Sequence, residues 1–346
     1  MLPAAPAGAQ PDPGHIRSIT RSIVREAIES VRLERYQRDR DRGEQREEQT
    51  ERFTRTLRIG AAGEVDVSNV AGDIVVSRGG GENVTIEVIK TARARTVEDA
   101  REALKFVQVD VTDRPGRAEA RARYPRSQDI PARFRRNLSV SVEYRISAPE
   151  AARVTARSIS GDITVRDIRG DLTLDTVSGD IQIANAARIP MAKTISGDVE
   201  IADTKIEGTL GASTVSGTLL LRRVQATRLD LSTISGDVTL VDVDCNRIDG
   251  QTVSGEVQLS GALARGGRYE LRSHSGEVRV AVSGTTGFEL EASSFSGSVR
   301  SDFELTLRGS DTGRGRRQRA IRGTFGDGSA VLSLSTFSGD IIVSKR

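Results

Sequence analysis

The stretch that decides the fold is Ser158-Ile159-Ser160-Gly161-Asp162, which returns as Thr176-Val177-Ser178-Gly179-Asp180 and Thr194-Ile195-Ser196-Gly197-Asp198. Further copies of this phrase follow at residues 214–218, 233–237, 252–256, 273–277, 294–298 and 336–340. Successive Ser-Gly pairs are 18, 18, 20, 19, 19, 21, 21 and 42 residues apart, and we interpret the last interval as two periods with one blurred copy. A fixed period near twenty residues predicts a solenoid, in which each coil covers the apolar surface of its neighbour.

The phrase also predicts which side chains lie inside. In residues 177–183 every second position is apolar or glycine, the two-residue period of a strand with one buried face. This parity places the glycines inside, at bends too tight for a Cβ, and the hydroxyl residue of each phrase outside as a ladder. The predicted inward column is Ile159, Val177, Ile195, Val215, Ile234, Val253, His274, Phe295 and Phe337. His274 is interpreted as a structural histidine, not a functional one.

Apolar pairs precede each phrase in the opposite phase, as Leu172 and Leu174 do before Val177. A turn or bulge is therefore expected between the two, so that each coil holds at least two short strands. The alternation and the abundance of Val, Ile and Thr exclude a helical repeat. The prediction is an all-β chain: a parallel β-solenoid, of the β-helix or β-roll kind, with about 19–21 residues per coil over residues 151–346.

An acid follows the glycine in most copies. The column is Asp162, Asp180, Asp198, Asp237, Glu256, Glu277 and Asp340, interrupted by Thr218 and Ser298. Stacked like charges repel by about 1 kcal/mol per pair even in water, so something must offset this. Side-chain bonds to turn amides or to nearby arginines are the favoured explanation. A calcium row is the alternative, although the glycine-rich calcium-binding nonapeptide is missing and the column is broken twice.

The segments before the repeats differ in composition. Residues 1–14 are interpreted as a flexible tail or signal-peptide remnant, because Ala7-Gly8-Ala9 resembles the end of a signal sequence. Residues 15–52 predict a charged helix or linker, with charge continuing to Arg58. Residues 53–150 predict an irregular β-rich cap, with a degenerate phrase at 70–76 and a short helix capped by Thr96.

Two features concern the far end of the repeats. Residues 309–328 interrupt the repeat with five arginines and are expected to form a solvated loop, the alternative being a grip on a phosphate-rich polymer. The chain stops directly after the last phrase, at Ile341 and Ile342. An open strand edge is expected there, covered by the arginine-rich loop, by the terminal Lys345-Arg346 or by another copy of the protein. A homo-oligomer is therefore one of the expected states.

The composition provides few candidates for catalytic, cofactor-binding or metal-binding residues. The formal net charge is +3, the pI is near 9.2 and Trp is absent. Cys245 is the single cysteine, expected as a small buried residue, and His15 and His274 are too few for a multi-histidine metal site. No run of eighteen apolar residues or Gly-x-Ser-x-Gly elbow occurs. We therefore expect no catalytic, cofactor-binding or metal-ligating residues, no cofactor, no nucleic-acid partner and no transmembrane segment.

The opening Ala-Gly-Asp-Ile at 71–74, the acidic short helix, the Tyr-Arg-Ile-Ser-Ala-Pro strand ending at Pro149 and the serial Ser-Gly-Asp copies resemble the bacterial putative-adhesin β-repeat family, a domain of unknown function. The resemblance covers roughly residues 53–346. It implies a β-helical exported or surface-associated protein and no reaction. The expected function is a non-enzymatic adhesin or cell-envelope scaffold, in the periplasm, at the outer surface or outside the cell, that binds an envelope polymer or protein. The alternatives are an envelope-stress or signalling accessory and a carbohydrate-active β-helix enzyme.

Overall fold

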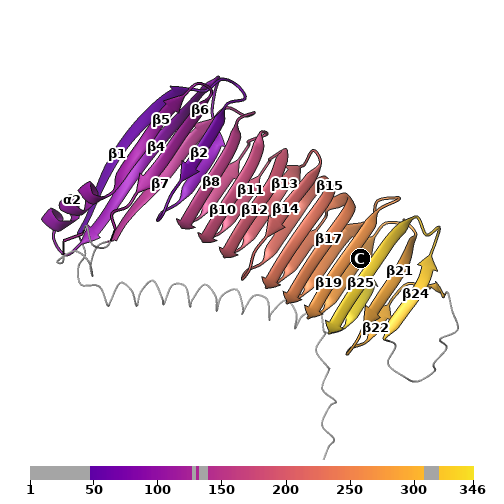
Figure 1. Ribbon diagram of the computed structural model, residues 1–346. Coiled ribbons are helices and arrows are strands. Elements are labelled where there is room, and N and C mark those ends of the chain that lie inside the picture. The colour runs from indigo at the N-terminus through magenta and orange to yellow at the C-terminus, as the bar shows by residue number, and fades with distance from the viewer. Residues whose placement is uncertain (1–46, 127–129, 132–138, 308–318) are drawn as a thin grey trace, which may run out of the picture.

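The computed structural model describes residues 47–126, 130–131, 139–307 and 319–346, and almost all of these lie in strands. Each phrase of the repeat sits where one strand of a coil ends and the next begins. In β10 (Asp171–Ser178) the buried residues are Leu172, Leu174 and Thr176, and β11 (Ile181–Ala184) follows after the glycine corner. The prediction of an all-β chain is confirmed, and the sheet is solenoid-like (Figure 1).

The coils stack so that equivalent strands pair in parallel and form two faces around one apolar core. The first face contains, in spatial order, β5 (Gln108–Arg114), β6 (Arg117–Arg123), β2 (Glu64–Ser68), β8 (Arg153–Ser160), β10, β12 (Arg188–Ser196), β14 (Thr209–Ser213), the second half of β15 (Leu219–Ser235), β17 (Asp244–Ser254), β19 (Arg268–Ser275), β25 (Ala330–Ser338), β21 (Phe288–Ser294), β24 (Ala320–Phe325) and β23 (Thr306–Leu307).

The second face contains, in the same order, β1 (Glu47–Arg58), β4 (Asn83–Ala94), β7 (Ser139–Ala148), β3 (Ile74–Arg78), β9 (Ile163–Arg166), β11, β13 (Val199–Lys205), the first half of β15, β16 (Val238–Val241), β18 (Val257–Ala262), β20 (Val278–Ser283), β26 (Ile341–Lys345) and β22 (Val299–Ser301). The degenerate phrase near residue 72 forms the corner between β2 and β3. This coil lies inside the stack, with β6 and β7 on one side and the first regular coil, β8 and β9, on the other.

The last coil in the sequence is not the last coil in space. Strand β25 inserts between β19 and β21, and β26 inserts between β20 and β22. The expectation of an open edge at Ile341 and Ile342 is therefore wrong, because both strands of this coil are paired on each side. The 42-residue interval does not hide a blurred coil either. Its described part forms β22, β23, β24 and β25, and β24 pairs antiparallel with β21 at the far end of the stack.

Strand β24 also corrects the prediction of an arginine-rich solvated loop for residues 309–328. Residues 320–325 of that segment form the strand, and its Arg322 contacts Glu291 of β21 at 2.5 Å. The residues from 309 to 318, with three of the five arginines, lie outside the described part of the chain.

At the opposite end, antiparallel strands close the stack. Strand β1 pairs with β4 over its whole length, so the predicted charged helix is wrong for residues 47–58; residues 1–46, with the proposed signal remnant, lie outside the described ranges. The predicted short helix is confirmed as α2 (Val97–Phe106). The Thr96 hydroxyl accepts the Asp99 amide proton at 3.1 Å, which satisfies a donor that has no partner inside the helix.

The hydroxyl ladder lies inside the coils, and not outside as the alternation predicted. Thr176 and Thr194 are fully buried, and the equivalent hydroxyl residues of the other coils are nearly so. Each of these hydroxyls except that of Ser158 donates to the carbonyl oxygen of a corner glycine in the spatially preceding coil, as Thr194 does to Gly179 at 3.1 Å and Thr214 to Gly197 at 3.0 Å. A buried hydroxyl without a partner costs about 1–3 kcal/mol, so these bonds make the ladder compatible with an apolar core.

The ladder ends at Ser158, whose buried hydroxyl has no partner among the described residues. The equivalent acceptor, the Gly72 carbonyl, accepts the side-chain amide of Asn69 at 2.7 Å instead. Asn69 thus takes over the role of the hydroxyl in the first coil, and also donates to the Val142 carbonyl at 2.6 Å.

The corner glycines occupy equivalent positions, but what excludes a side chain there is the neighbouring coil and not the interior. Gly197 has φ +156°, and a Cβ at this position would lie 2.1 Å from the Gly179 carbonyl oxygen. The same glycine carbonyl that receives the threonine hydroxyl therefore occupies the space of a side chain at the next corner. Both the backbone conformation and the contact demand glycine.

We expect Gly197→Val to lower the free energy of unfolding by about 3 kcal/mol or more, because it adds backbone strain to an overlap that the coils can relieve only by separating. Urea unfolding monitored by circular dichroism measures the change. Gly80→Ala is the matched control, since its Cβ would meet nothing within 4 Å. A loss below 1 kcal/mol for Gly197→Val would contradict the proposed role of the corner.

Cys245 is buried, as predicted, and donates from Sγ to the Arg247 carbonyl oxygen at 3.0 Å. Burial raises the pKa of its thiol to about 11. Because only the thiolate is a nucleophile, the folded protein should react at least tenfold more slowly with a thiol reagent at pH 8 than the protein unfolded in denaturant. Absorbance during disulfide exchange with an aromatic disulfide measures both rates. Equal rates would show that the thiol is accessible in the folded state.

Candidate functional site

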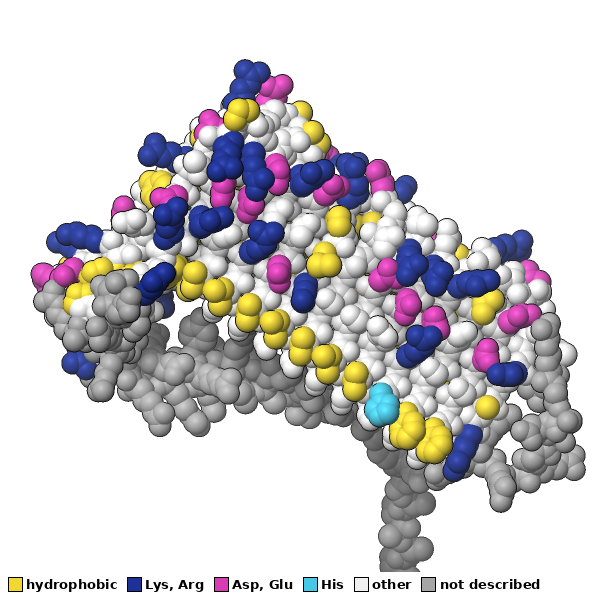
Figure 2. Space-filling view, viewed as in Figure 1, with side chains coloured by type: hydrophobic (Ala, Val, Ile, Leu, Met, Phe, Trp, Pro, Cys, Tyr) yellow, Lys and Arg dark blue, Asp and Glu magenta, His cyan; other side chains and the backbone are white. Residues whose placement is uncertain are grey.

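The most distinctive surface of the molecule is an exposed row of apolar side chains along the Ser-Gly edge. In spatial order this apolar ridge consists of Val70, Ile159, Val177, Ile195, Val215, Ile234, Val253, His274, Phe337 and Phe295. Val70 is half-buried, and the exposed aliphatic and phenyl members range from 36% at Val215 to 65% at Phe295. Figure 2 shows the ridge as a yellow line that ends in the cyan histidine and two more yellow side chains. The predicted inward column is therefore outside.

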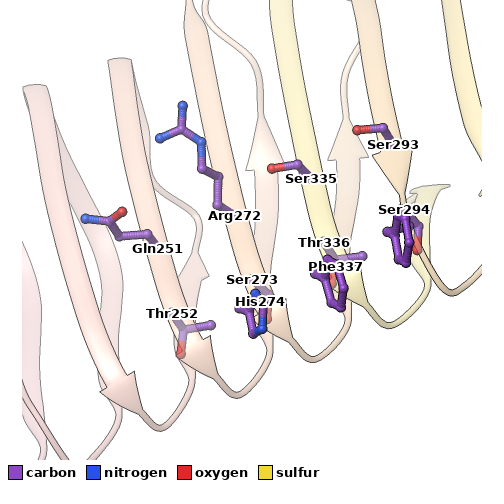
Figure 3. Close-up of a pocket in the computed structure, with 11 residues that line it drawn as sticks. Gln251, Thr252, Arg272, Ser273, His274, Ser293, Ser294, Ser335, Thr336 and Phe337 are labelled. Atoms are coloured by element: carbon purple, nitrogen blue, oxygen red, sulfur yellow. The ribbon is translucent and has the colours of Figure 1, made fainter.

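The ridge ends in three stacked rings, which Figure 3 shows beside the neighbouring hydroxyl residues. The centroids of His274 and Phe337 are 4.9 Å apart with an interplanar angle of 10°, and those of Phe337 and Phe295 are 4.6 Å apart at 7°. The strand spacing sets this separation, which is also that of a stacked aromatic pair. His274 is thus an exposed member of the stack, and not the inward residue that was predicted.

A shallow groove runs beside the ridge on the first face. One hollow of about 590 Å³ is lined by the rings and by Gln251, Arg272, Ser293 and Ser335, and another of about 370 Å³ continues past Lys193. Both hollows share Gln251 and Thr252, so the groove is continuous. Its outer wall is the column of first-face residues two positions before the ridge. We call this column the groove wall, although its members line the hollows only from Lys193 onward. In spatial order it consists of Ser68, Arg157, Asp175, Lys193, Ser213, Ser232, Gln251, Arg272, Ser335 and Ser293.

The ridge arises because the alternation of buried and exposed residues is interrupted within the phrase. Strand β10 stays regular through its hydroxyl residue, so Leu172, Leu174 and Thr176 are all buried and Val177 points outward. Ser178 is exposed as well, and parity resumes with Ile181 only after the glycine corner. The signal was present in the sequence, since Thr176 shares the parity of Leu172 and Leu174. A hydrophobic residue in an otherwise alternating run is normally assigned to the core, and here that assignment is wrong.

The acid column is structural, as favoured from the sequence. Asp162 Oδ1 accepts the backbone N–H of Asp180 at 2.8 Å, and Asp180 Oδ1 accepts that of Asp198 at 2.8 Å. The next coil has Thr218 in place of an acid, and its amide still donates to Asp198 at 2.7 Å. A hydrogen bond to a charged acceptor contributes about 1.5–3 kcal/mol, which exceeds the repulsion of about 1 kcal/mol between exposed neighbouring charges.

The two glutamates of the column are held differently. Asp237 still accepts the Glu256 amide at 2.8 Å, whereas the longer carboxylates of Glu256 and Glu277 contact Arg279, at 3.4 and 2.6 Å respectively. In the coil inserted from the carboxyl end, Asp340 accepts both the amide and the hydroxyl of Ser298. Every interruption of the column is thus accommodated by a neighbouring polar group.

The opposite edge carries a polar row. At equivalent corners Asp167, Asn185, Asp203, Arg223 and Asp242 are exposed, with φ between 52° and 60°. Asn and Asp tolerate this left-handed conformation better than other side chains. Adjacent members bond along the stack: the Asn185 amide donates to Asp167 at 2.6 Å, and Arg223 Nη2 donates to Asp203 at 2.8 Å. We call these five residues the polar edge.

Charge pairing keeps two aspartates of the polar edge ionised. The guanidinium of Arg223 lowers the pKa of Asp203, and that of Arg346 lowers the pKa of Asp242, through direct hydrogen bonds in both cases. Both carboxyls therefore retain their charge below the usual range of aspartate. Since these groups are fully exposed, solvent screens the pairs and they serve mainly to fix the side-chain positions.

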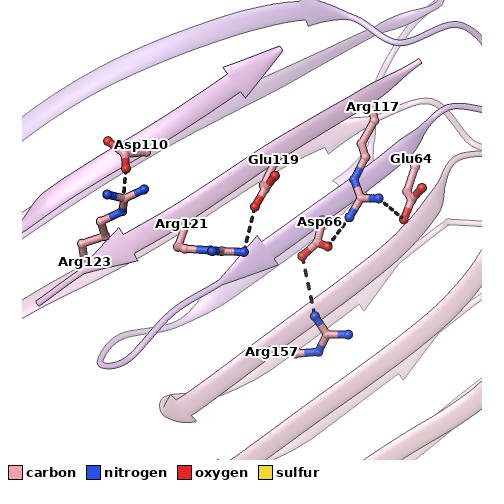
Figure 4. Close-up of polar contacts among 8 residues, drawn as sticks. All are labelled: Glu64, Asp66, Asp110, Arg117, Glu119, Arg121, Arg123 and Arg157. Carbon is pink, nitrogen blue, oxygen red and sulfur yellow. Dashed lines mark hydrogen bonds and ion pairs between the residues drawn. The ribbon is translucent and has the colours of Figure 1, made fainter. Parts of the chain in front are cut away.

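A second polar cluster fastens the amino-terminal strands to the stack (Figure 4). Asp66 is almost buried and receives Arg117 Nη2 at 2.6 Å, while Arg157 approaches its other oxygen at 4.0 Å. Arg117 also contacts Glu64 at 3.6 Å. These pairs connect β6, β2 and β8, so their evident role is to hold the coil junction together.

Within the ranges given above, no group of three or more His, Cys, Asp and Glu side chains is placed to hold a metal ion. No helix in those ranges is both long and apolar enough to cross a bilayer.

We expect Asp198→Ala to lower the free energy of unfolding by about 1.5–3 kcal/mol, because the Thr218 amide loses a charged acceptor. Asp198→Asn retains an acceptor oxygen and should cost less than half as much. Urea unfolding of both variants measures the difference. Millimolar calcium should leave the melting temperature of the unaltered protein unchanged, whereas a rise of many degrees that a chelator reverses would identify the column as a cation site instead.

Comparisons with known proteins identify a domain family of unknown function. The Toastrack DUF4097 family profile matches residues 62–344, and no curated protein matches the chain. Similar solved structures include a putative adhesin from Bacteroides fragilis (12% identity, 86% of this chain and 97% of that chain, TM-score 0.39). Another is a putative lipid binding protein from Parabacteroides distasonis (12% identity, 84% of this chain and 96% of that chain, TM-score 0.37). A third is a putative adhesin from Parabacteroides merdae (9% identity, 86% of this chain and 96% of that chain, TM-score 0.28). By the extent of the profile match, the chain belongs to the Toastrack DUF4097 family.

Proposed function

We propose that the protein is a non-enzymatic, exported binding scaffold of the adhesin type, a rigid parallel β-solenoid that acts at the cell envelope. The observation that carries the proposal is the polar edge, where Asp167, Asn185 and Asp203 repeat similar polar groups at one coil spacing. A polymer with a repeating polar unit can contact several coils at once. Avidity then replaces a deep pocket, because each further contact is intramolecular.

The titratable groups support a scaffold over an enzyme. The acid column is engaged with backbone amides, as Asp180 is with Asp198. Burial raises the pKa of Cys245 to about 11 and that of Tyr269 to about 12, away from the range where a general acid or base works at neutral pH. Tyr269 also uses its hydroxyl structurally, accepting the Ala264 amide proton at 2.7 Å and donating to the Cys245 carbonyl at 3.0 Å.

The binding test uses isolated cell envelopes and purified protein. Asn185→Gly removes a side chain from the polar edge while glycine keeps the left-handed backbone, so the fold should be preserved. The triple variant Asp167→Gly, Asn185→Gly, Asp203→Gly should lower envelope retention by about tenfold or more, since losses multiply in a multivalent contact. Co-sedimentation with envelopes measures retention. Met191→Asp, which changes an exposed residue away from this edge, is the control and should bind normally.

Localisation is tested separately in cells that express the full gene. We expect the protein outside the cytoplasm, where protease added to intact cells or to released periplasm degrades it. Immunoblotting of each fraction with an antiserum against the purified protein measures this. Recovery solely from the cytosol would refute export and favour an intracellular accessory role.

A further inference from the structure

We propose that the apolar ridge is a self-association surface, along which two copies of the chain pair antiparallel. Ten coils each contribute one side chain to it, from Val70 to Phe295, and most of these are about half exposed. Scattered exposed apolar residues need no explanation, but a continuous row over the whole stack is typical of an interaction site. The inference does not depend on the proposed function, because it uses the edge opposite the polar edge.

The side chains of the ridge are larger at its carboxyl-terminal end than at its amino-terminal end, which suits an antiparallel partner. Its amino-terminal members are Val and Ile, and its carboxyl-terminal members are His274, Phe337 and Phe295. When two complete ridges run in opposite directions, every large side chain meets a smaller one. The opposed pairs are Val70 with Phe295, Ile159 with Phe337, Val177 with His274, Ile195 with Val253, and Val215 with Ile234. A parallel pair would instead oppose ring to ring at one end and leave a gap at the other.

The groove wall matches in the same register. Asp175 is the one acid among its members, and the antiparallel alignment places it opposite Arg272 of the partner. Lys193 meets Gln251, Ser213 meets Ser232 and Arg157 meets Ser335, so no like charges oppose each other across this wall. Charge complementarity of this kind fixes register more than it adds affinity.

The shapes also fit a twofold pair. The twofold axis of an antiparallel pair is perpendicular to the ridge, so ridge faces ridge, groove faces groove and groove wall faces groove wall. The coil spacing of the two copies is identical, so the register of the opposed ridges is kept along all ten coils. A standard stable interface buries about 800 Å² per partner, which is the area that ridge and groove wall together would have to supply.

Other occupants fit less well. The acid column, including Asp162, Asp180 and Asp198, follows the ridge along the same edge and would repel an anionic lipid surface. Sugar rings stack on aromatic faces, but Phe337 is covered on both faces by its neighbours, His274 and Phe295. A second copy needs no free ring face.

The first experiment measures the oligomeric state of the purified full chain by sedimentation equilibrium over a dilution series. The unaltered protein should be a dimer at micromolar concentration. The double variant Ile195→Asp, Val253→Asp places carboxylates opposite each other in the proposed register and should raise the dimer dissociation constant at least 100-fold. Both side chains are exposed, so the melting temperature should stay within a few degrees of the unaltered value. Met191→Asp, also exposed but off the ridge, should remain dimeric.

The second experiment tests the register by disulfide formation under mild oxidation. The double variant Val177→Cys, His274→Cys should form a covalent dimer, because these positions oppose each other in antiparallel ridges. Each single variant should not, since its own counterpart on the partner lies five coils away, about 24 Å at the strand spacing. Buried Cys245 should remain reduced.

Several results would overturn the proposal. A monomer at 100 micromolar would do so, whether the ridge is then accessible or covered by another segment of the same chain. Efficient crosslinking of either single variant would show a different register. A protein that stays monomeric but binds phosphatidylcholine or phosphatidylglycerol vesicles through the ridge would identify a lipid surface as its partner.

Discussion

The carbonyl oxygen of each corner glycine is the contact on which the stack depends. It accepts the buried hydroxyl of the following coil, as Gly179 does from Thr194, and it occupies the place where a side chain at the next corner would lie. One atom therefore imposes glycine at the corner, a hydroxyl residue three positions earlier and the distance between coils. The sequence phrase repeats because each coil must satisfy the same atom of the coil before it.

The two edges of the stack have opposite chemistry for a reason rooted in backbone geometry. At the Ser-Gly edge the chain turns with a glycine in an extended left-handed conformation, and the residue two positions before it points outward whatever its polarity. At the other edge the chain turns through the left-handed helical region, which favours Asn and Asp. The polar edge follows from conformational preference, whereas the apolar ridge has no such local cause. Its residues therefore need an explanation outside the fold.

Much of this architecture follows from the sequence. The period predicts the coils, Thr96 predicts the start of α2, and the need to offset stacked charges predicts the bonds of Asp180 and Asp198. Alternation counted backward from Ile181 crosses the glycine corner, where the order of buried and exposed positions is interrupted, and so it predicts a buried Val177. Alternation counted forward from Leu172 predicts an exposed Val177, as the structure has it. The inserted coil was missed because spacing along the chain carries no information about order in space. Residues 47–58 are charged on both sides of β1, a pattern that an exposed edge strand shares with a solvated helix.

Placing the final coil of the chain inside the stack has a consequence for the order in which the molecule is made. A ribosome that has released residues up to 329 has supplied every coil except the one that joins β19 to β21. The strands from 288 to 325 then lack the inner neighbours that β25 and β26 provide in the complete stack. Assembly cannot proceed steadily from one end to the other. The growing protein has two unpaired strand edges until β25 and β26 enter between them, so residues 330–345 complete the interior of the stack.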